Sequence, residues 1–154
     1  MSLVILNLQQ VPELIPTLAH WHLDEWQALY PFESLVDFEN DLRRSLNTDL
    51  VPSTWVLLQD GELVGSASLL DKDMNANEDL GPWLANVYVH PPFRGKGLAR
   101  LLIKQVLQQA DAGGFENIYL FTEGHRDWYQ QQGWQPLRRH PYEGAMVDVM
   151  KWTM

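Results

Sequence analysis

The chain has 154 residues, no cysteine, 45% hydrophobic residues and a formal net charge of −9 at neutral pH. This length and hydrophobic content predict a single domain over residues 1–154, and the lack of cysteine excludes disulfides, thiolate metal sites and a cysteine nucleophile. The missing cysteines agree with a cytoplasmic protein, and the acidic balance argues against nucleic acid and anionic membranes as partners.

The first half of the chain predicts a strand, two amphipathic helices and a β-hairpin. The strands are short runs rich in β-branched residues, and apolar residues recur every three or four positions in the helices. Asp60-Gly61 is typical of the two-residue turn of a hairpin. The predicted strands span residues 2–8, 54–59 and 62–70, and the predicted helices span residues 11–30 and 34–50.

An aromatic and acidic segment lies in the first predicted helix. Trp21, His22, Glu25 and Trp26 fall at helical neighbour spacings, so they could line a pocket for an acceptor molecule. The alternative is that the tryptophans pack in the core, as most tryptophans on such helices do. No metal site is predicted, because the acidic loop of residues 71–81 lacks the ordered spacing of a calcium-binding loop.

The second half of the chain predicts two strands joined by a helix, followed by a short helix and a final strand pair. A strand, a crossover helix and a second strand form a right-handed parallel unit, so we expect the first two strands to be parallel. The predicted strands span residues 83–89, 117–122, 135–140 and 145–152, and the predicted helices span residues 95–112 and 125–132.

The loop between the strand at residues 83–89 and the next helix has the sequence HPPFRGKGLA. Its prolines end the strand, while Gly95 and Gly97 let the backbone approach a ligand closely. A helix N-terminus offers unpaired N–H groups and a positive dipole end, so the loop predicts an anion site. The loop lacks the residues of a P-loop and of a dinucleotide fingerprint. The alternative is an ordinary strand-to-helix connection.

This loop resembles the acetyl-coenzyme A signature of the GNAT superfamily of N-acetyltransferases, Arg/Gln-x-x-Gly-x-Gly/Ala, which runs here from Arg94 to Ala99. A second segment, WYQQQGW from Trp128 to Trp134, is similar to the family's Phe-Tyr-x-x-x-Gly-Phe/Trp motif. The predicted order, β-α-α-β-β-β-α-β-α-β-β, also resembles that of the family. The resemblance implies an α/β fold with a mixed sheet of about seven strands and a splayed parallel pair at the cofactor site.

The resemblance further implies transfer of an acetyl group from acetyl-coenzyme A to a primary amine of a small molecule or peptide. Backbone N–H groups of the glycine loop would hold the pyrophosphate, and the preceding strand would pair with the pantetheine arm. The residues implied in cofactor binding are Val87, Tyr88, Val89, Arg94, Gly95, Lys96, Gly97, Leu98 and Ala99.

The catalytic residues are less completely specified. Tyr129 occupies the position where the family keeps a phenol near the sulfur, which suits it to protonate the departing thiolate. Where many relatives have a glutamate as base, this chain has Ala85 and Asn86, neither of which can accept the proton. We favour Glu123 or His125, which follow the strand at residues 117–122. The other candidate bases are Glu25, Asp71 and Asp73.

The charge is unevenly distributed along the chain. Residues 1–80 carry 14 Asp and Glu against 3 Lys and Arg, a net of −11, whereas residues 81–154 carry 6 against 8, a net of +2. An acidic half beside a neutral-to-basic half favours a cationic acceptor beside an anionic cofactor, although a soluble surface explains the acidic excess equally well. An alternative function is a non-catalytic coenzyme A-binding or interaction module. The chain could be a monomer or a homodimer.

Overall fold

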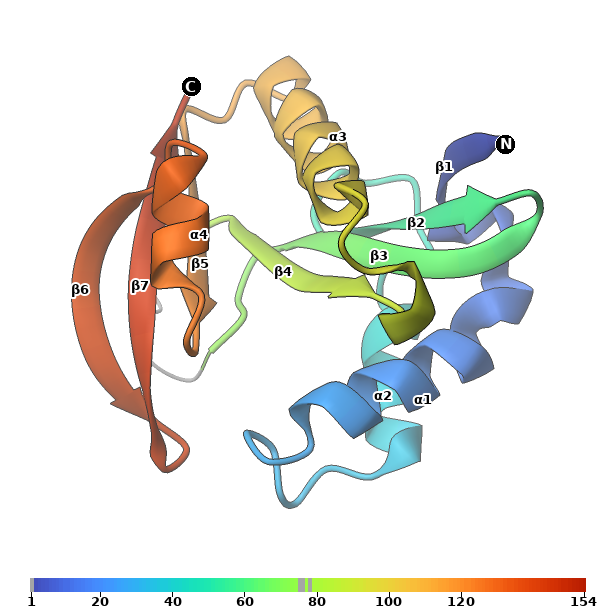
Figure 1. The fold of residues 1–154 in the computed structure, drawn as a ribbon, viewed down its shortest axis with the longest axis horizontal. Helices are drawn as coiled ribbons and strands as arrows, with labels where there is room; N and C mark the ends of the chain where they lie inside the picture. The colour runs from blue at the N-terminus through green and yellow to red at the C-terminus, as the bar shows by residue number, and fades with distance from the viewer. Residues whose placement is uncertain (1, 75–76, 78) are drawn as a thin grey trace.

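A seven-stranded mixed sheet organises the molecule, in the order β1-β2-β3-β4-β5-β7-β6 (Figure 1). The computed structural model describes residues 2–74, 77 and 79–154. The strands are β1 Leu3–Asn7, β2 Ser53–Gln59, β3 Glu62–Leu70, β4 Trp83–Val89, β5 Asn117–Thr122, β6 Gln135–Tyr142 and β7 Ala145–Thr153. The helices are α1 Ile15–Trp26, α2 Leu35–Arg43, α3 Leu98–Ala112 and α4 Arg126–Gln131. The predicted α/β class and order of elements are confirmed.

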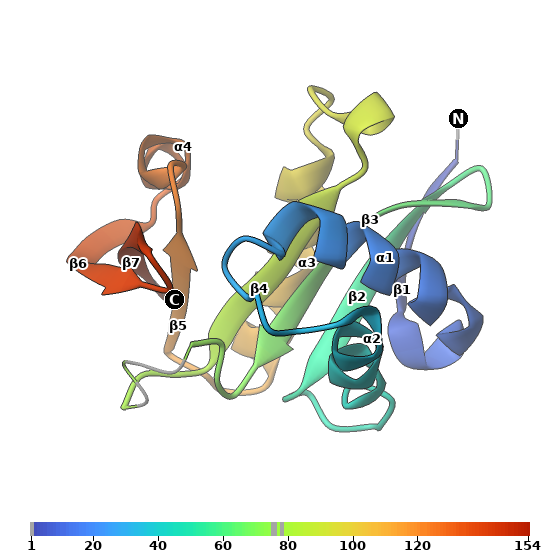
Figure 2. The same ribbon diagram turned by 90° about the horizontal axis from the view of Figure 1, so that it is seen from below.

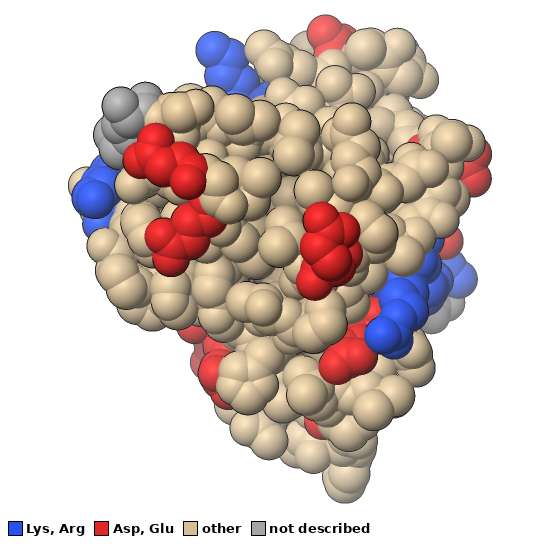
Figure 3. Space-filling view, turned by 90° about the vertical axis from the view of Figure 1, so that its right-hand side faces the viewer, with Lys and Arg blue, Asp and Glu red and all other residues tan. Residues whose placement is uncertain are grey.

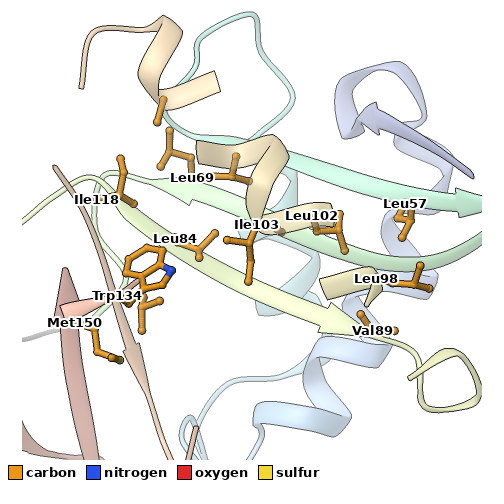
Figure 4. Packing of buried hydrophobic residues seen from close by; sticks show 14 of the residues in the cluster. Leu57, Leu69, Leu84, Val89, Leu98, Leu102, Ile103, Ile118, Trp134 and Met150 are labelled. Carbon is orange, nitrogen blue, oxygen red and sulfur yellow. The ribbon is translucent and has the colours of Figure 1, made fainter. Parts of the chain in front are cut away.

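Helices cover both faces of the sheet, because neighbouring residues of its central strands are buried on opposite sides. Leu57 of β2 packs in the cluster that contains α3, whereas the preceding residue, Val56, packs in the cluster that contains α1 and α2. On α3, Leu98 and Leu102 are four residues apart and lie on one stripe, facing the sheet (Figure 4). Figure 2 shows α3 on the face of the sheet opposite α1 and α2.

The parallel strands β4 and β5 diverge soon after they begin. They pair at one position, Trp83 with Tyr119, and the Tyr119 N–H donates to the Pro82 carbonyl at 3.0 Å. Beyond that point the two strands separate, as both ribbon views show (Figures 1 and 2). The predicted splayed pair is therefore confirmed. Within the described part of the chain, the edge of β4 that faces β5 has no strand partner over most of its length.

The second predicted helix is shorter than its pattern suggested. It was expected to reach residue 50, but α2 ends at Arg43. After it, the Asn47 side chain donates to the Arg44 carbonyl at 2.8 Å and accepts from the Asp49 N–H at 2.7 Å. Ser45 forms a buried hydrogen bond with Thr54 at 2.9 Å. These side-chain hydrogen bonds compete with the backbone hydrogen bonds that would continue the helix, so α2 ends before residue 50.

The turn between β2 and β3 has the predicted geometry. Asp60 and Gly61 have φ values of +50° and +84°, as a type I′ hairpin turn requires, so the predicted hairpin is confirmed. In the acidic loop after β3, residues 75–76 and 78 lie outside the described residues.

Acidic groups lie in several places on one face of the molecule (Figure 3). Figure 3 shows acidic groups in several separate places on the side of the molecule that lies to the right in Figure 1, with Lys and Arg near the edges of the view. Within the part of the chain that the structure describes, no helix is long and apolar enough to cross a membrane.

Candidate functional site

The glycine loop before α3 presents unused hydrogen-bond donors. Gly95 and Gly97 have φ values of +80° and +76°, which L residues rarely adopt, and Gly97 is the N-cap of α3. Among the described residues, the backbone N–H groups of residues 95–98 have no hydrogen-bond acceptor. A Cβ added at either glycine would meet no atom within 4 Å, so the loop is open on that side. These donors and the positive end of the helix dipole can hold an anion.

Arg94, at the start of the loop, is held by three contacts. Its Nε donates to the Val89 carbonyl at 2.7 Å, which fixes the loop to the end of β4. One terminal nitrogen, Nη2, lies 3.5 Å from Oε2 of Glu25 in α1. The guanidinium carbon is 5.5 Å from the centre of the Tyr88 ring. The loop is therefore tied both to its own strand and to a helix on the other side of the sheet.

A cavity of about 360 Å³ lies between the end of β4, the glycine loop and α4. Seven of the nine predicted cofactor-binding residues line it, and Lys96 and Gly97 do not. The sequence reasoning missed Phe93 and Trp128 as lining residues. Trp128 could have been found, because it precedes Tyr129 in the second motif. The full lining is Glu25, Val87, Tyr88, Val89, Phe93, Arg94, Gly95, Leu98, Ala99, His125, Trp128 and Tyr129.

Asn86, one of the two residues at the position expected for a catalytic base, forms a bulge in β4. Its φ is +53°, and the pairing of β3 with β4 shifts between Ser66 and Ser68. The Asn86 side chain donates to the Ser68 hydroxyl at 3.2 Å, and its carbonyl accepts from the Ser66 hydroxyl at 2.8 Å. Asparagine tolerates the left-handed region better than most residues do. The residue therefore shapes the strand at the site rather than supplying a base.

A larger cavity of about 730 Å³ adjoins the first, and the two share Glu25, Val87, His125 and Tyr129. The predicted catalytic residues Glu123, His125 and Tyr129 all line the larger cavity. The other candidate bases, Glu25, Asp71 and Asp73, also line it. The fold thus gathers residues that are distant in sequence around one space, and Tyr129 lies where the two cavities meet.

The larger cavity is rich in carboxylates. Among the residues that the structure describes, seven acidic residues line it, against Arg44 and Lys72, which gives these side chains a formal charge of −5. Burial raises the pKa of Asp73 to about 7. Burial is also the main cause that raises the pKa of Glu33, and neighbouring carboxylates raise it further. A cation inside the cavity would lower the pKa of both groups. The acidic residues are Glu25, Glu33, Asp41, Asp71, Asp73, Glu123 and Glu143.

Tyr129 is suited to donate a proton. Burial raises the pKa of its phenol to about 12, so the group stays protonated at neutral pH. Its ring packs edge-on against Trp128, with centroids 4.9 Å apart, and against Trp134, with centroids 6.1 Å apart. These contacts orient the phenol from α4 without using its oxygen.

His22 of α1, one of the four residues predicted as a possible pocket lining, lies in the lining of the larger cavity together with Glu25 and Trp26, whereas Trp21 does not. The exposed fraction of His22 is 2%, and its Nε2 lies 2.9 Å from the Ser66 hydroxyl. Because that hydroxyl gives its one proton to the Asn86 carbonyl, it must accept a proton from Nε2. Burial lowers the pKa of His22 to about 3, so the ring is neutral at pH 7.

This buried histidine predicts loss of stability in acid. The unfolded chain takes up a proton near pH 6.5, whereas the folded protein does so only near pH 3. We therefore expect a stabilising contribution that is fully present above pH 6.5 and falls by up to about 1.4 kcal/mol per pH unit as the pH drops towards 3. In His22→Gln this slope should be flatter when urea unfolding is measured between pH 7 and pH 4. The matched control is His20→Gln, an exposed position on the same helix; equal slopes in the two variants would contradict the prediction.

Three comparisons with known proteins agree with this geometry. The sequence model described as the acetyltransferase (GNAT) family matches residues 15–134. An amino-acid acetyltransferase of Yersinia enterocolitica is 31% identical over 67 residues, which are 44% of this chain and 13% of that protein. The N-acetyltransferase YjgM of Escherichia coli, described as uncharacterized, is 35% identical over 68 residues, 44% of this chain and 40% of that protein. The matched stretch is less than half of either relative.

Solved structures share the fold over nearly the whole chain. An aminoglycoside 6'-N-acetyltransferase complexed with coenzyme A has a TM-score of 0.78 at 14% identity, covering 97% of this chain and 96% of that one. The acetyltransferase yncA of Salmonella typhimurium, described as putative and solved with acetyl-coenzyme A, has a TM-score of 0.70 at 19% identity, covering 99% and 94%. Among the described residues, no group of three or more His, Asp or Glu could hold a metal ion.

Proposed function

The chain belongs to the acetyltransferase (GNAT) family, and from this premise we propose that it transfers the acetyl group of acetyl-coenzyme A to a primary amine of a small molecule or peptide. The match of the family model to residues 15–134 confirms the family predicted from the sequence. The observation that carries the proposal is the smaller cavity, which joins the open glycine loop to the unpaired edge of β4.

The donors around this cavity fit acetyl-coenzyme A, which supplies an activated thioester when bound. The free N–H groups of residues 95–98 would hold the pyrophosphate, as expected at the start of a helix. No described residue pairs as a strand with the edge of β4 from Val87 to Val89 on the side of β5, so this edge offers backbone groups to an extended pantetheine arm. Both parts of the cofactor are thus matched by groups that the fold leaves unpaired.

Transfer of the acetyl group needs three proton movements, which we assign to residues of the chain. A base would take one proton from the ammonium of the acceptor, so that its nitrogen can form a bond to the acetyl carbon. As the carbon–sulfur bond breaks, Tyr129 would give its proton to the thiolate, and the second proton lost by the nitrogen would restore the phenol. We propose Glu123 or His125 as the base, since both follow β5 and line the larger cavity with Tyr129. Asp73 is the competing candidate, because a pKa of about 7 lies near working pH.

We propose that the acceptor occupies the larger cavity and is cationic. The cavity adjoins the smaller one at four residues, and its formal charge of −5 favours an ammonium. Two of the compared proteins are named for amine-bearing acceptors, namely amino acids and an aminoglycoside.

The proposal predicts that acetyl-coenzyme A raises the melting temperature of the protein. At 100 times its dissociation constant, a ligand of the folded state stabilises by about 2.7 kcal/mol. Thermal unfolding with and without the cofactor measures this, and no shift would contradict the proposal. A panel of primary amines, assayed for release of free thiol, then tests transfer. Cofactor binding without thiol release on any amine would favour the non-catalytic module instead.

A further inference from the structure

Glu25 places a carboxylate inside the cavity proposed for an anionic cofactor. It lies in the last turn of α1 and lines both cavities. Of the four residues common to the two cavities, Glu25 is the one that carries a carboxylate. Its Oε2 is 3.5 Å from Nη2 of Arg94, at the start of the glycine loop. The carboxylate of Glu25 would repel the diphosphate of a bound cofactor, so its position calls for an explanation.

Different nitrogens of Arg94 hold the loop on β4 and contact Glu25. Its Nε donates to the Val89 carbonyl at 2.7 Å, and this bond holds the loop on β4 whether or not Glu25 is present. The terminal Nη2 contacts Glu25, and both side chains are close to half exposed, at 47% and 43%. Exposed pairs of this kind are weak, so a diphosphate of higher charge beside Arg94 can displace a single carboxylate.

We infer that Glu25 is a displaceable counter-ion for Arg94, which gives way to the diphosphate of the cofactor and returns to Arg94 when the cofactor leaves. This inference rests on the proposed function. The exchange lowers the affinity for coenzyme A, because binding must break the pair between Glu25 and Arg94. It also provides Arg94 with a partner during release. The consequence is faster departure of the coenzyme A product than the glycine loop alone would allow.

The test compares Glu25→Gln with Asp24→Asn, using calorimetry for affinity and stopped-flow displacement for the dissociation rate. Asp24 is the neighbouring exposed residue, paired with His20 at 3.6 Å and absent from the lining of both cavities. We expect Glu25→Gln to bind coenzyme A about two- to fivefold more tightly and to release it more slowly, with Asp24→Asn unchanged. Neither variant should alter binding of pantetheine, which has no diphosphate.

An Arg94→Gln background separates competition from simple repulsion between Glu25 and the diphosphate. If Glu25 competes with the diphosphate for Arg94, the gain in coenzyme A affinity from Glu25→Gln should shrink when Arg94 is replaced. If Glu25 simply repels the diphosphate, the same gain should remain. Equal tightening in both backgrounds would overturn the inference, and so would weaker binding of coenzyme A by Glu25→Gln, which would make Glu25 a tether of the loop. Failure of the unmutated protein to bind coenzyme A would instead refute the proposed function.

Discussion

Replacing Gly97 with aspartate is expected to abolish the stabilisation by acetyl-coenzyme A while leaving the protein folded. Gly97 is the N-cap of α3, with a φ of +76° and no atom within 4 Å of an added Cβ. Aspartate visits the left-handed region more readily than most residues and is common at N-caps, so the helix should form. Its carboxylate would bring a negative charge, and an acceptor for the loop N–H groups, to the site proposed for the pyrophosphate.

The matched control is Gly97→Asn, which has the same size and backbone cost without the charge. We expect the asparagine variant to keep most of the rise in melting temperature and the aspartate variant to show none. The two variants should have similar melting temperatures without the cofactor. If Gly97→Asp were stabilised by acetyl-coenzyme A as strongly as the unmutated protein, the anion site would lie elsewhere.

Replacing Tyr129 with phenylalanine should cause a large fall in kcat. A positioned general acid contributes about 100-fold or more to the rate, so kcat should fall by at least about that factor. The aromatic ring and its contacts with Trp128 and Trp134 remain, and binding of the cofactor should therefore be nearly unchanged. Steady-state kinetics with calorimetry of coenzyme A binding separates these effects.

The pH dependence and a second variant sharpen this prediction. Because burial raises the pKa of Tyr129 to about 12, the phenol keeps its proton throughout the usual assay range. Ionisation of Tyr129 should therefore cause no loss of activity below about pH 11. Tyr119→Phe removes a phenol from β5 outside both cavities and should leave kcat unchanged. Unchanged turnover in Tyr129→Phe would show that another group protonates the thiolate.

Most of the fold could be predicted because its signals are local. The strands β3 and β4 have the bounds expected from their runs of apolar and β-branched residues, and the hairpin turn follows from Asp60-Gly61. The end of α2 could not be predicted from periodicity. Its stripe continued to residue 50, but Asn47 and Ser45 found other hydrogen-bond partners.

The site divides in the same way. The sequence by itself determined the family and the glycine loop, and it predicts the phenol of Tyr129 as the general acid, because each depends on residues close together along the chain. The tertiary structure alone decided the bulge at Asn86, the burial of His22 and the pairing of Glu25 with Arg94, which are 69 residues apart. Such contacts depend on how helices and strands pack around the divergence of β4 from β5, and no local pattern encodes that packing.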